Sequence, residues 1–315
     1  MINRTMVRTR VMQALFAYDQ NEGKTQLTAR KELLSSFAST YSLYMVLLEL
    51  INETTRYAEQ QLEEENRRAK ITHREYTPNR RFVENRFAKQ MFENRALRHY
   101  IDEQRLSWDT GMDAVHALYK SIIGASFYKE YMQKEEVTYA DDRRIWKKIF
   151  EYLVPECASL PPALDEMEVR LDQTNWATDM EVVATYVVKT IKSFQEDSSS
   201  DHPLLEMFAN EEELEFGTQL LQYAIEKGDE YAVLIEKNLK NWEADRIAYM
   251  DKVILRLALA EILNFPEIAL EVSLNEYLEM AKEYSTEKSH LFINGILDVI
   301  LKGLKAEDAM VKNIR

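Results

Sequence analysis

Glycine is scarce in this sequence, and that scarcity limits the available folds more than any other feature. The 315 residues include only 7 glycines and 6 prolines. Sheet-rich folds use glycine in tight turns, and phosphate-binding loops use it to bring the backbone close to a ligand, so both are disfavoured. Few prolines leave long stretches uninterrupted for helices. The sequence therefore predicts an all-α fold.

Apolar residues recur at helical spacing along most of the chain. Residues 251–263 are apolar almost all round, which is typical of a central buried helix, and Asp251 suits its N-terminus. Ser273 and Glu276 have the spacing of a capping box, and Gly228 predicts a break. The expected helices cover residues 2–19, 29–66 (one helix or two), 110–132, 139–154, 176–194, 214–239, 242–250, 251–263, 273–284 and 288–303.

The middle of the chain contains a basic stretch, residues 67–105, with eleven Lys and Arg against five Asp and Glu. Aromatic residues such as Phe87 and Tyr100 are interleaved with the cations. Arginines can hold phosphates and aromatic rings can stack on unpaired bases. The alternative interpretation is an amphipathic region with its rings in the core and its arginines in water. Both interpretations remain open at this stage.

No catalytic or metal-binding pattern is visible. The five histidines and the single Cys157 do not fall at metal-ligand spacing, and no phosphate-binding loop or nucleophile motif occurs. Asp141 and Asp142 are followed by two arginines, which favours a helix N-terminus over a paired-carboxylate site. We expect no enzyme activity, no metal and no cofactor.

Charge and composition limit the environment and the partners. The net charge is −14, so any nucleic acid must meet a local basic patch. No signal peptide is recognisable, and no apolar run approaches the roughly 18 residues of a membrane span. One cysteine fits a reducing compartment. We expect a cytoplasmic protein without membrane contact. The polar segment 195–203 is the expected internal boundary.

The C-terminal third closely resembles the NusB family of transcription antitermination factors. The last matching stretch is Ser289 to Asp298, where the family shows a Ser, a Phe and then Val/Ile-Asn-Gly-Val/Ile-Leu-Asp. The first helix also matches, at Arg8 and Gln13–Phe16. The other matching residues are Trp242, Arg246, Asp251–Ala258, Glu261–Leu263, Asn275, Glu276, Ala281 and Lys282.

The resemblance implies NusB-like helical bundles with a large additional helical insertion after the first helix. Residues 1–29 would hold the first NusB-like helix, 30–200 the insertion, and 201–315 the NusB-like C-terminal helical domain. It also implies a non-enzymatic RNA-binding protein without cofactor. Such a protein binds boxA RNA with the ribosomal protein NusE. Within the RNA polymerase antitermination complex it promotes read-through, notably of rRNA operons. The sequence leaves open a monomer or a homodimer.

Site residues follow from the resemblance position by position. Cations suit phosphates, amides and hydroxyls suit base edges, and an aromatic ring suits stacking. Phe16 and Asp251 match positions that face NusE, and an acid suits a basic partner. The residues expected to bind RNA are Arg4, Arg8, Arg10, Gln13, Lys282, Lys288, Ser289, His290, Phe292 and Asn294.

The chain departs from its relatives in the first helix, where Thr5 and Met6 occupy positions that are often basic. One hypothesis is therefore that residues 67–105 supply a second RNA contact. The alternative function is a NusB-fold protein-interaction scaffold with weak or no RNA binding. An RNA-modifying enzyme with a NusB-like domain is disfavoured, because the chain lacks the glycine-rich α/β motifs of such enzymes.

Overall fold

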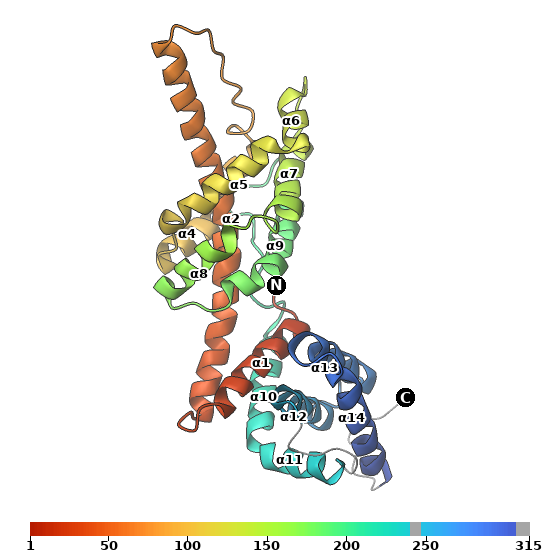
Figure 1. The fold of residues 1–315 in the computed structure, drawn as a ribbon. Coiled ribbons are helices and arrows are strands. Elements are labelled where there is room, and N and C mark those ends of the chain that lie inside the picture. The colour runs from red at the N-terminus through yellow and green to blue at the C-terminus, as the bar shows by residue number, and fades with distance from the viewer. Residues whose placement is uncertain (240–246, 307–315) are drawn as a thin grey trace. The chain divides into compact units, whose positions relative to one another are not determined.

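The structure is a computed structural model that describes residues 1–239 and 247–306, and most of these residues are helical (Figure 1). Within them the only β-type pairing is an isolated bridge between Ile2 and Phe208. The predicted all-α class is confirmed.

The chain divides into two compact units. Unit 1 contains Met1 and Ser36–Met207, and unit 2 contains Ile2–Ser35 and the chain from Phe208 onward. The boundary between Ser35 and Ser36 falls inside helix α2 (Gln26–Ile71), which is continuous across it.

Unit 2 is a helical bundle around α12 (Tyr249–Asn264). The buried residues of α12 cover nearly every side of the helix, from Asp251 to Ile262, as the sequence predicted for a central helix. Five helices pack against it: α1 (Arg4–Asp19), α10 (Glu211–Glu226), α11 (Gly228–Lys237), α13 (Leu270–Tyr284) and α14 (Ser289–Ala306).

Unit 1 is built on the long helix α2, whose residues 42–48 are all buried. Two buried indole rings fix it in place: Trp108 donates to the carbonyl of Val46 at 3.0 Å, and Trp176 donates to the carbonyl of Ser39 at 2.9 Å. The other helices are α3 (Arg86–Glu93), α4 (Arg95–Gln104), α5 (Met112–Gly124), α6 (Ser126–Gln133), α7 (Tyr139–Lys148), α8 (Leu160–Leu171) and α9 (Trp176–Ser193). Two short elements join them, a 3₁₀ helix at Asp109–Gly111 and a π-helical segment at Ile149–Leu153.

Helix α2 also corrects one expectation. By length and composition alone it passes the test for a membrane-spanning helix, although the sequence was expected to contain no such segment. Serine and threonine interrupt its apolar run without making the window strongly polar. In the structure 67% of that window is buried, as in the core helix of a folded domain.

Several helix boundaries were predicted well and others were not. The break at Gly228 is confirmed. Residues 110–132 form two helices, α5 and α6, because the chain is extended at Ala125. Helix α13 begins after Ala269 and not at Ser273, so the predicted capping box is wrong. Of the helix expected at 242–250, residues 242–246 lie outside the described residues.

Candidate nucleic-acid interface

The residues expected to meet RNA lie on α1, α13 and α14 and in the turn before α14, all within unit 2. Helix α1 begins where Asn3 accepts a hydrogen bond from the backbone N–H of Met6 at 2.9 Å. An asparagine at this position satisfies an amide that the helix itself leaves unpaired. The cap sets the start of α1, and with it the direction of the arginines that follow.

Arg8 lies inside the bundle and not on its surface. Its side chain is 2% exposed, and it donates from Nε to Glu261 Oε2 at 2.7 Å and from Nη2 to Glu261 Oε1 at 2.9 Å. Its Nη1 lies 3.4 Å from Glu276. The guanidinium is therefore occupied within the fold, and the sequence-based expectation that it meets phosphate is replaced by a structural role.

Glu261 collects further hydrogen bonds at the centre of the bundle. The Ser273 hydroxyl donates to it at 2.6 Å and the Tyr277 hydroxyl at 2.8 Å. Burial alone would raise the pKa of Glu261, but the hydrogen bonds and charge of Arg8 outweigh burial and hold that pKa below its ordinary value. The network keeps a charged carboxylate in the core and joins α1, α12 and α13.

The other α1 positions differ in exposure. Arg4 is 36% exposed and pairs with Glu213 at 3.3 Å, above the ring of Phe216. Arg10 is buried and donates to Gln13 at 2.8 Å. Of the three predicted arginines of α1, only Arg4 presents a substantial surface.

A second polar network involves two further predicted residues. Asp251, at the start of α12, is buried and accepts a hydrogen bond from the Ser285 hydroxyl at 2.5 Å. Ser289 is buried, and its hydroxyl lies 3.0 Å from that of Ser285 and 2.7 Å from that of Thr286. Because these groups bind one another, Ser289 and Asp251 fix the turn between α13 and α14 and do not form an open contact surface.

The remaining predicted positions on α13 and α14 differ in their exposure to solvent. Lys282, Lys288 and Asn294 are exposed, and Lys282 pairs with Glu279. His290 is half-buried, and Phe292 is buried at 8% exposure. The structure thus leaves the two lysines and the asparagine accessible, whereas the phenylalanine packs in the core.

The groove between α1 and α13 is acidic. It encloses about 270 Å³ and is lined by Thr5, Thr9, Asn275, Glu276, Glu279, Met280 and Glu283. Two of its three glutamates are paired, Glu276 with Arg8 and Glu279 with Lys282, and Glu283 adds negative charge that disfavours phosphate. This groove therefore does not supply the positive charge that α1 lacks at Thr5 and Met6.

Phe16, one of the two residues expected to face a protein partner, is half-buried. Its ring meets that of Tyr249 edge to face, with centroids 5.5 Å apart. Tyr249 is 41% exposed and borders a cavity of about 240 Å³ that also contains Asp19, Asp229 and Glu236. Lys252 and Arg256 also line the cavity, and Arg256 pairs with Asp19, so the accessible groups here are one aromatic ring, carboxylates and the exposed Lys252.

The basic stretch 67–105 lies in unit 1, and acids neutralise much of it. Six of its eleven cations form ion pairs with Glu or Asp: Arg67, Arg68, Arg80, Arg86, Lys89 and Arg95. Phe82 and Phe87 are buried, whereas Phe92 is 51% exposed. The interpretation as an amphipathic region with core aromatics is the one that the structure favours.

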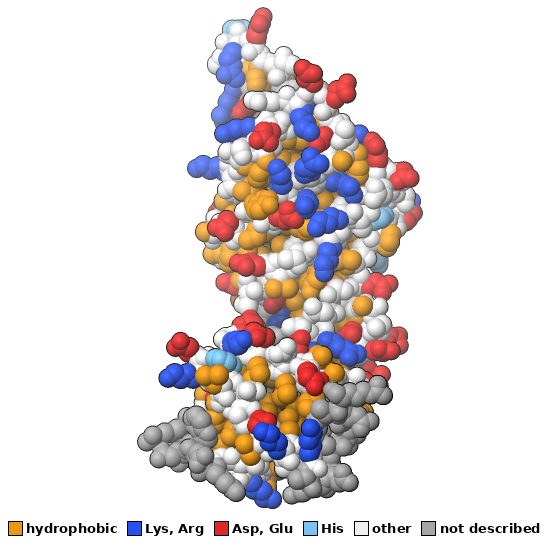
Figure 2. Space-filling view, turned by 90° about the vertical axis from the view of Figure 1, so that its right-hand side faces the viewer, with side chains coloured by type: hydrophobic (Ala, Val, Ile, Leu, Met, Phe, Trp, Pro, Cys, Tyr) orange, Lys and Arg blue, Asp and Glu red, His pale blue; other side chains and the backbone are white. Residues whose placement is uncertain are grey.

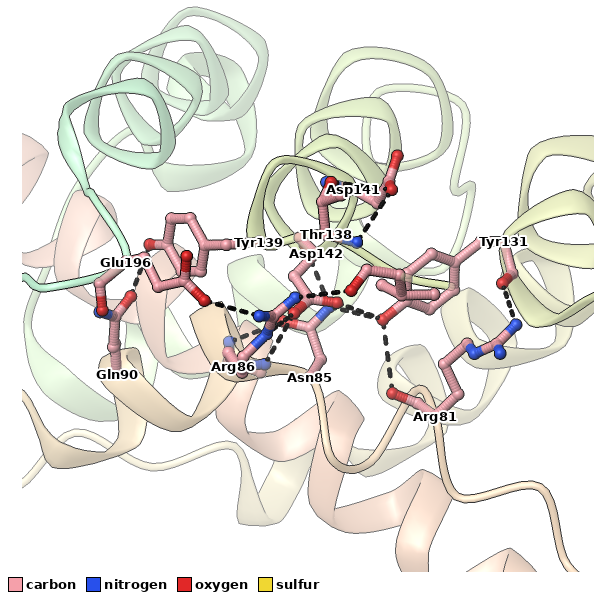
Figure 3. Close-up of polar contacts among 12 residues, drawn as sticks. Arg81, Asn85, Arg86, Gln90, Tyr131, Thr138, Tyr139, Asp141, Asp142 and Glu196 are labelled. Carbon is pink, nitrogen blue, oxygen red and sulfur yellow. Dashed lines mark hydrogen bonds and ion pairs between the residues drawn. The ribbon is translucent and has the colours of Figure 1, made fainter. Parts of the chain in front are cut away.

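Figure 3 shows how the most connected of these cations is held. Arg86 donates from Nε to the buried Asp142 at 2.6 Å and from Nη1 to Glu196 at 2.6 Å. The Tyr131 hydroxyl donates to Asp142 at 2.7 Å, and Asn85 donates to the Asp142 carbonyl at 3.0 Å. The acids at the start of α7 are therefore structural, as the sequence predicted for a helix N-terminus.

Helix α7 begins with a capping box that the sequence analysis did not identify. Asp141 accepts from the Thr138 N–H at 3.1 Å while Thr138 caps the helix, and Lys134 donates to Asp141 at 2.6 Å. Burial would raise the pKa of Asp141, but Lys134 and Thr138 lower it to about 2.

Among the described residues no group of three or more His, Cys, Asp or Glu could hold a metal.

Comparison with known proteins places the similarity in the C-terminal part of the chain. The model of the NusB family matches residues 181–302. Proteins named transcription antitermination protein NusB are 44% identical over 93 residues in Finegoldia magna, 38% over 114 in Koribacter versatilis and 39% over 101 in Salinibacter ruber. These matches cover 30%, 35% and 32% of this chain, and 68%, 78% and 63% of the three relatives. No solved structure was found to match.

Proposed function

Because the chain belongs to the NusB family, we propose that it is a transcription antitermination factor that binds boxA RNA together with NusE. The complex would act with RNA polymerase to promote read-through, notably of rRNA operons. The protein would act in the cytoplasm, where transcription takes place, and it would need no cofactor.

The similarity across α12 to α14 carries this proposal. The relatives named for antitermination are 38–44% identical to this chain, and the family match runs to residue 302. The segment includes two sets of hydrogen bonds that fix these helices against one another. One joins Asp251, Ser285 and Ser289, and the other centres on Glu261. A bundle held in this way presents the exposed positions of α13 and α14 in a defined arrangement.

The proposed RNA contacts are the predicted residues that have accessible side chains. Lys282, Lys288 and Arg4 provide positive charge for phosphate, and Asn294 provides an amide for a base edge. His290 lies half-buried near Lys288 at the start of α14. Arg8, Arg10, Ser289 and Phe292 act instead by holding these helices in place.

The proposed NusE contact is the surface around Phe16 and Tyr249. The half-exposed Tyr249 supplies an aromatic anchor, and Asp229 and Glu236 supply negative charge near it. Aromatic residues are common energetic centres of protein interfaces, and acids suit a basic ribosomal protein. Asp251, which is buried, would support this surface without touching the partner.

One observation favours a second candidate, a protein-interaction scaffold with weak or no RNA binding. Arg8 and Arg10 are buried, and three glutamates line the groove between α1 and α13. Few cations therefore remain on the surface of unit 2 that is expected to meet RNA.

A binding experiment separates the two candidates. Fluorescently labelled boxA RNA and a scrambled control are titrated with the full chain, with and without purified NusE, at several salt concentrations. The antitermination proposal expects salt-dependent binding that favours boxA and tightens with NusE. Binding of NusE alone, with no RNA shift at any salt concentration, would support the scaffold. Binding of neither would overturn both.

A further inference from the structure

Unit 1 contains a basic groove between α7 and α9, formed by residues that are not among the predicted RNA-binding positions. It encloses about 180 Å³ and is lined by Ala140, Arg143, Arg144, Lys147, Ile191 and Lys192. Four of the six lining residues are cations and none is an acid. In Figure 2, Lys and Arg side chains gather on the visible face of this unit.

The charges of α7 are segregated by the fold. Its two acids, Asp141 and Asp142, are buried and bound by Lys134 and Arg86 respectively. Its cations point outward: the side chains of Arg144 and Lys147 are 63% and 38% exposed. The accessible surface of the helix is therefore strongly positive, although its sequence also contains acids.

The neighbouring acids neutralise the groove only in part. Asp141 lies 3.7 Å from Arg144 but is already bound by Lys134 at 2.6 Å. Glu151 lies 3.5 Å from Lys147, and surface ion pairs of this kind contribute little to the free energy of folding. Glu196 is held by Arg86. An incoming anion would compete with one acid at Arg144 and with one at Lys147.

Arg143 fixes the geometry of the groove. Its Nη1 donates to the carbonyl of Lys192 at 3.0 Å and to that of Phe194, joining α7 to the end of α9. Carbonyls at a helix C-terminus carry partial negative charge that would repel phosphate. Because Arg143 binds them, the end of α9 can border an anion site. Ile191, 1% exposed, forms part of its apolar floor.

We propose that this groove binds the phosphates of an RNA chain, so that unit 1 supplies a second RNA contact. The proposal rests on the proposed function of the protein in binding RNA. It places that contact outside residues 67–105, where acids lie among the cations and pair with six of the eleven. In a chain of net charge −14, an unbalanced cationic groove also directs a polyanion to this face. A second groove shares Arg144 but includes Glu130 and Asp141, so the proposal is limited to the first.

The test compares three triple variants of the full chain. R144Q/K147Q/K192Q removes three exposed cations of the groove and leaves Arg143 in place. K31Q/K120Q/K237Q removes three exposed cations elsewhere and serves as the control with equal charge change. R144K/K147R/K192R retains the groove charge. Each is titrated with labelled boxA RNA and with an oligouridylate over a range of salt, and circular dichroism checks the fold.

Loss of three phosphate contacts should reduce the slope of log K against log salt by about 2, since each contact to a single strand contributes about 0.7. Wild type would then lose about 20-fold more affinity than the groove variant when salt rises about fourfold. The control and the charge-retaining variant should keep the wild-type slope on both RNAs.

The outcomes separate this inference from the proposed function. An unchanged slope in R144Q/K147Q/K192Q, with boxA binding intact, would overturn the groove and leave the antitermination function standing. A groove variant that loses NusE or anionic vesicles, but not RNA, would also overturn it. No RNA binding by wild type would overturn both.

Discussion

Arg8 in the first helix and Glu261 in the central helix form a buried ion pair with two hydrogen bonds, at 2.7 and 2.9 Å, across 253 residues of sequence. Unit 1 lies between them in the chain, so the pair joins two distant parts of the sequence within unit 2. Ser273 and Tyr277 complete the acceptor side. A residue that the family pattern associates with RNA is in this protein a centre of the bundle.

The first prediction concerns that pair. Arg8→Ala should lower the free energy of unfolding by about 3–5 kcal/mol, because it leaves Glu261 charged and unpaired in the core. Denaturant unfolding measures this loss of stability. Arg4→Ala on the same helix removes a partly exposed pair and should cost about 0–1 kcal/mol. Equal effects of the two substitutions would contradict the structural role of Arg8.

A double substitution sharpens this prediction. Arg8→Met combined with Glu261→Leu removes both charges and fills their space with apolar groups, so it should destabilise the protein less than Arg8→Ala alone. If the double variant is the less stable of the two, the loss in Arg8→Ala does not come from an unpaired carboxylate.

The second prediction concerns Gly228, which lies against Arg256. A Cβ at this position would lie 2.4 Å from Arg256 Nη2. That guanidinium is held by Asp19 at 3.0 Å and by the carbonyl of Ala224, so it cannot move without losing those bonds. Gly228→Ala should cost about 1–3 kcal/mol.

Gly303 is the matched control for Gly228. A Cβ there meets nothing within 4 Å, so Gly303→Ala in helix α14 should stabilise the protein by up to about 1 kcal/mol. Thermal unfolding of both variants measures the contrast. A neutral or stabilising Gly228→Ala would contradict the close approach of Arg256.

The third prediction concerns acid. Hydrogen bonds from Lys134 and Thr138 outweigh burial and lower the pKa of Asp141 to about 2, below its unfolded value. The charged carboxylate therefore stabilises the fold above about pH 4, and that contribution disappears as the pH falls toward about 2. The stability difference between wild type and Asp141→Asn should be constant near neutrality and shrink over this range.

A change at Lys134 tests the cause of that pH dependence. Lys134→Met removes the main hydrogen-bond donor to Asp141 and so brings the folded pKa of Asp141 back toward its unfolded value. The loss of stability between about pH 4 and about pH 2 should therefore be smaller than in wild type. Urea unfolding at a series of pH values gives the curves. Superimposable curves for wild type and Lys134→Met would show that another group is responsible.

The fourth prediction separates contact residues from core residues on α13 and α14. Lys282→Gln combined with Lys288→Gln should reduce the salt slope of RNA binding by about 1.4, with stability unchanged within about 0.5 kcal/mol. Phe292→Ala should instead cost about 3–5 kcal/mol of stability, because the ring is buried. An unchanged salt slope in the lysine variant would place the RNA contact elsewhere.

The helices were largely predictable because their signals are local. Apolar spacing located α1, α9 and α12, and the glycine at position 228 marked a real break. The division of the chain at residues 35 and 36 was not predictable, since it falls within the continuous helix α2 and no turn residue marks it. The predicted helix cap at Ser273 was wrong for a related reason. Its hydroxyl has the spacing of a cap, yet it binds Glu261 from inside α13.

The sequence by itself determined the helical class, the family, and the residue types available for RNA. Local periodicity and an ordered motif are properties of the chain alone. Only the tertiary structure decided which charges face the solvent. Arg8 became a core residue because Glu261 meets it there, and α7 became a basic surface because Lys134 and Arg86 bind its acids. Whether a charge is buried or accessible depends on partners distant in sequence, and no local pattern contains that information.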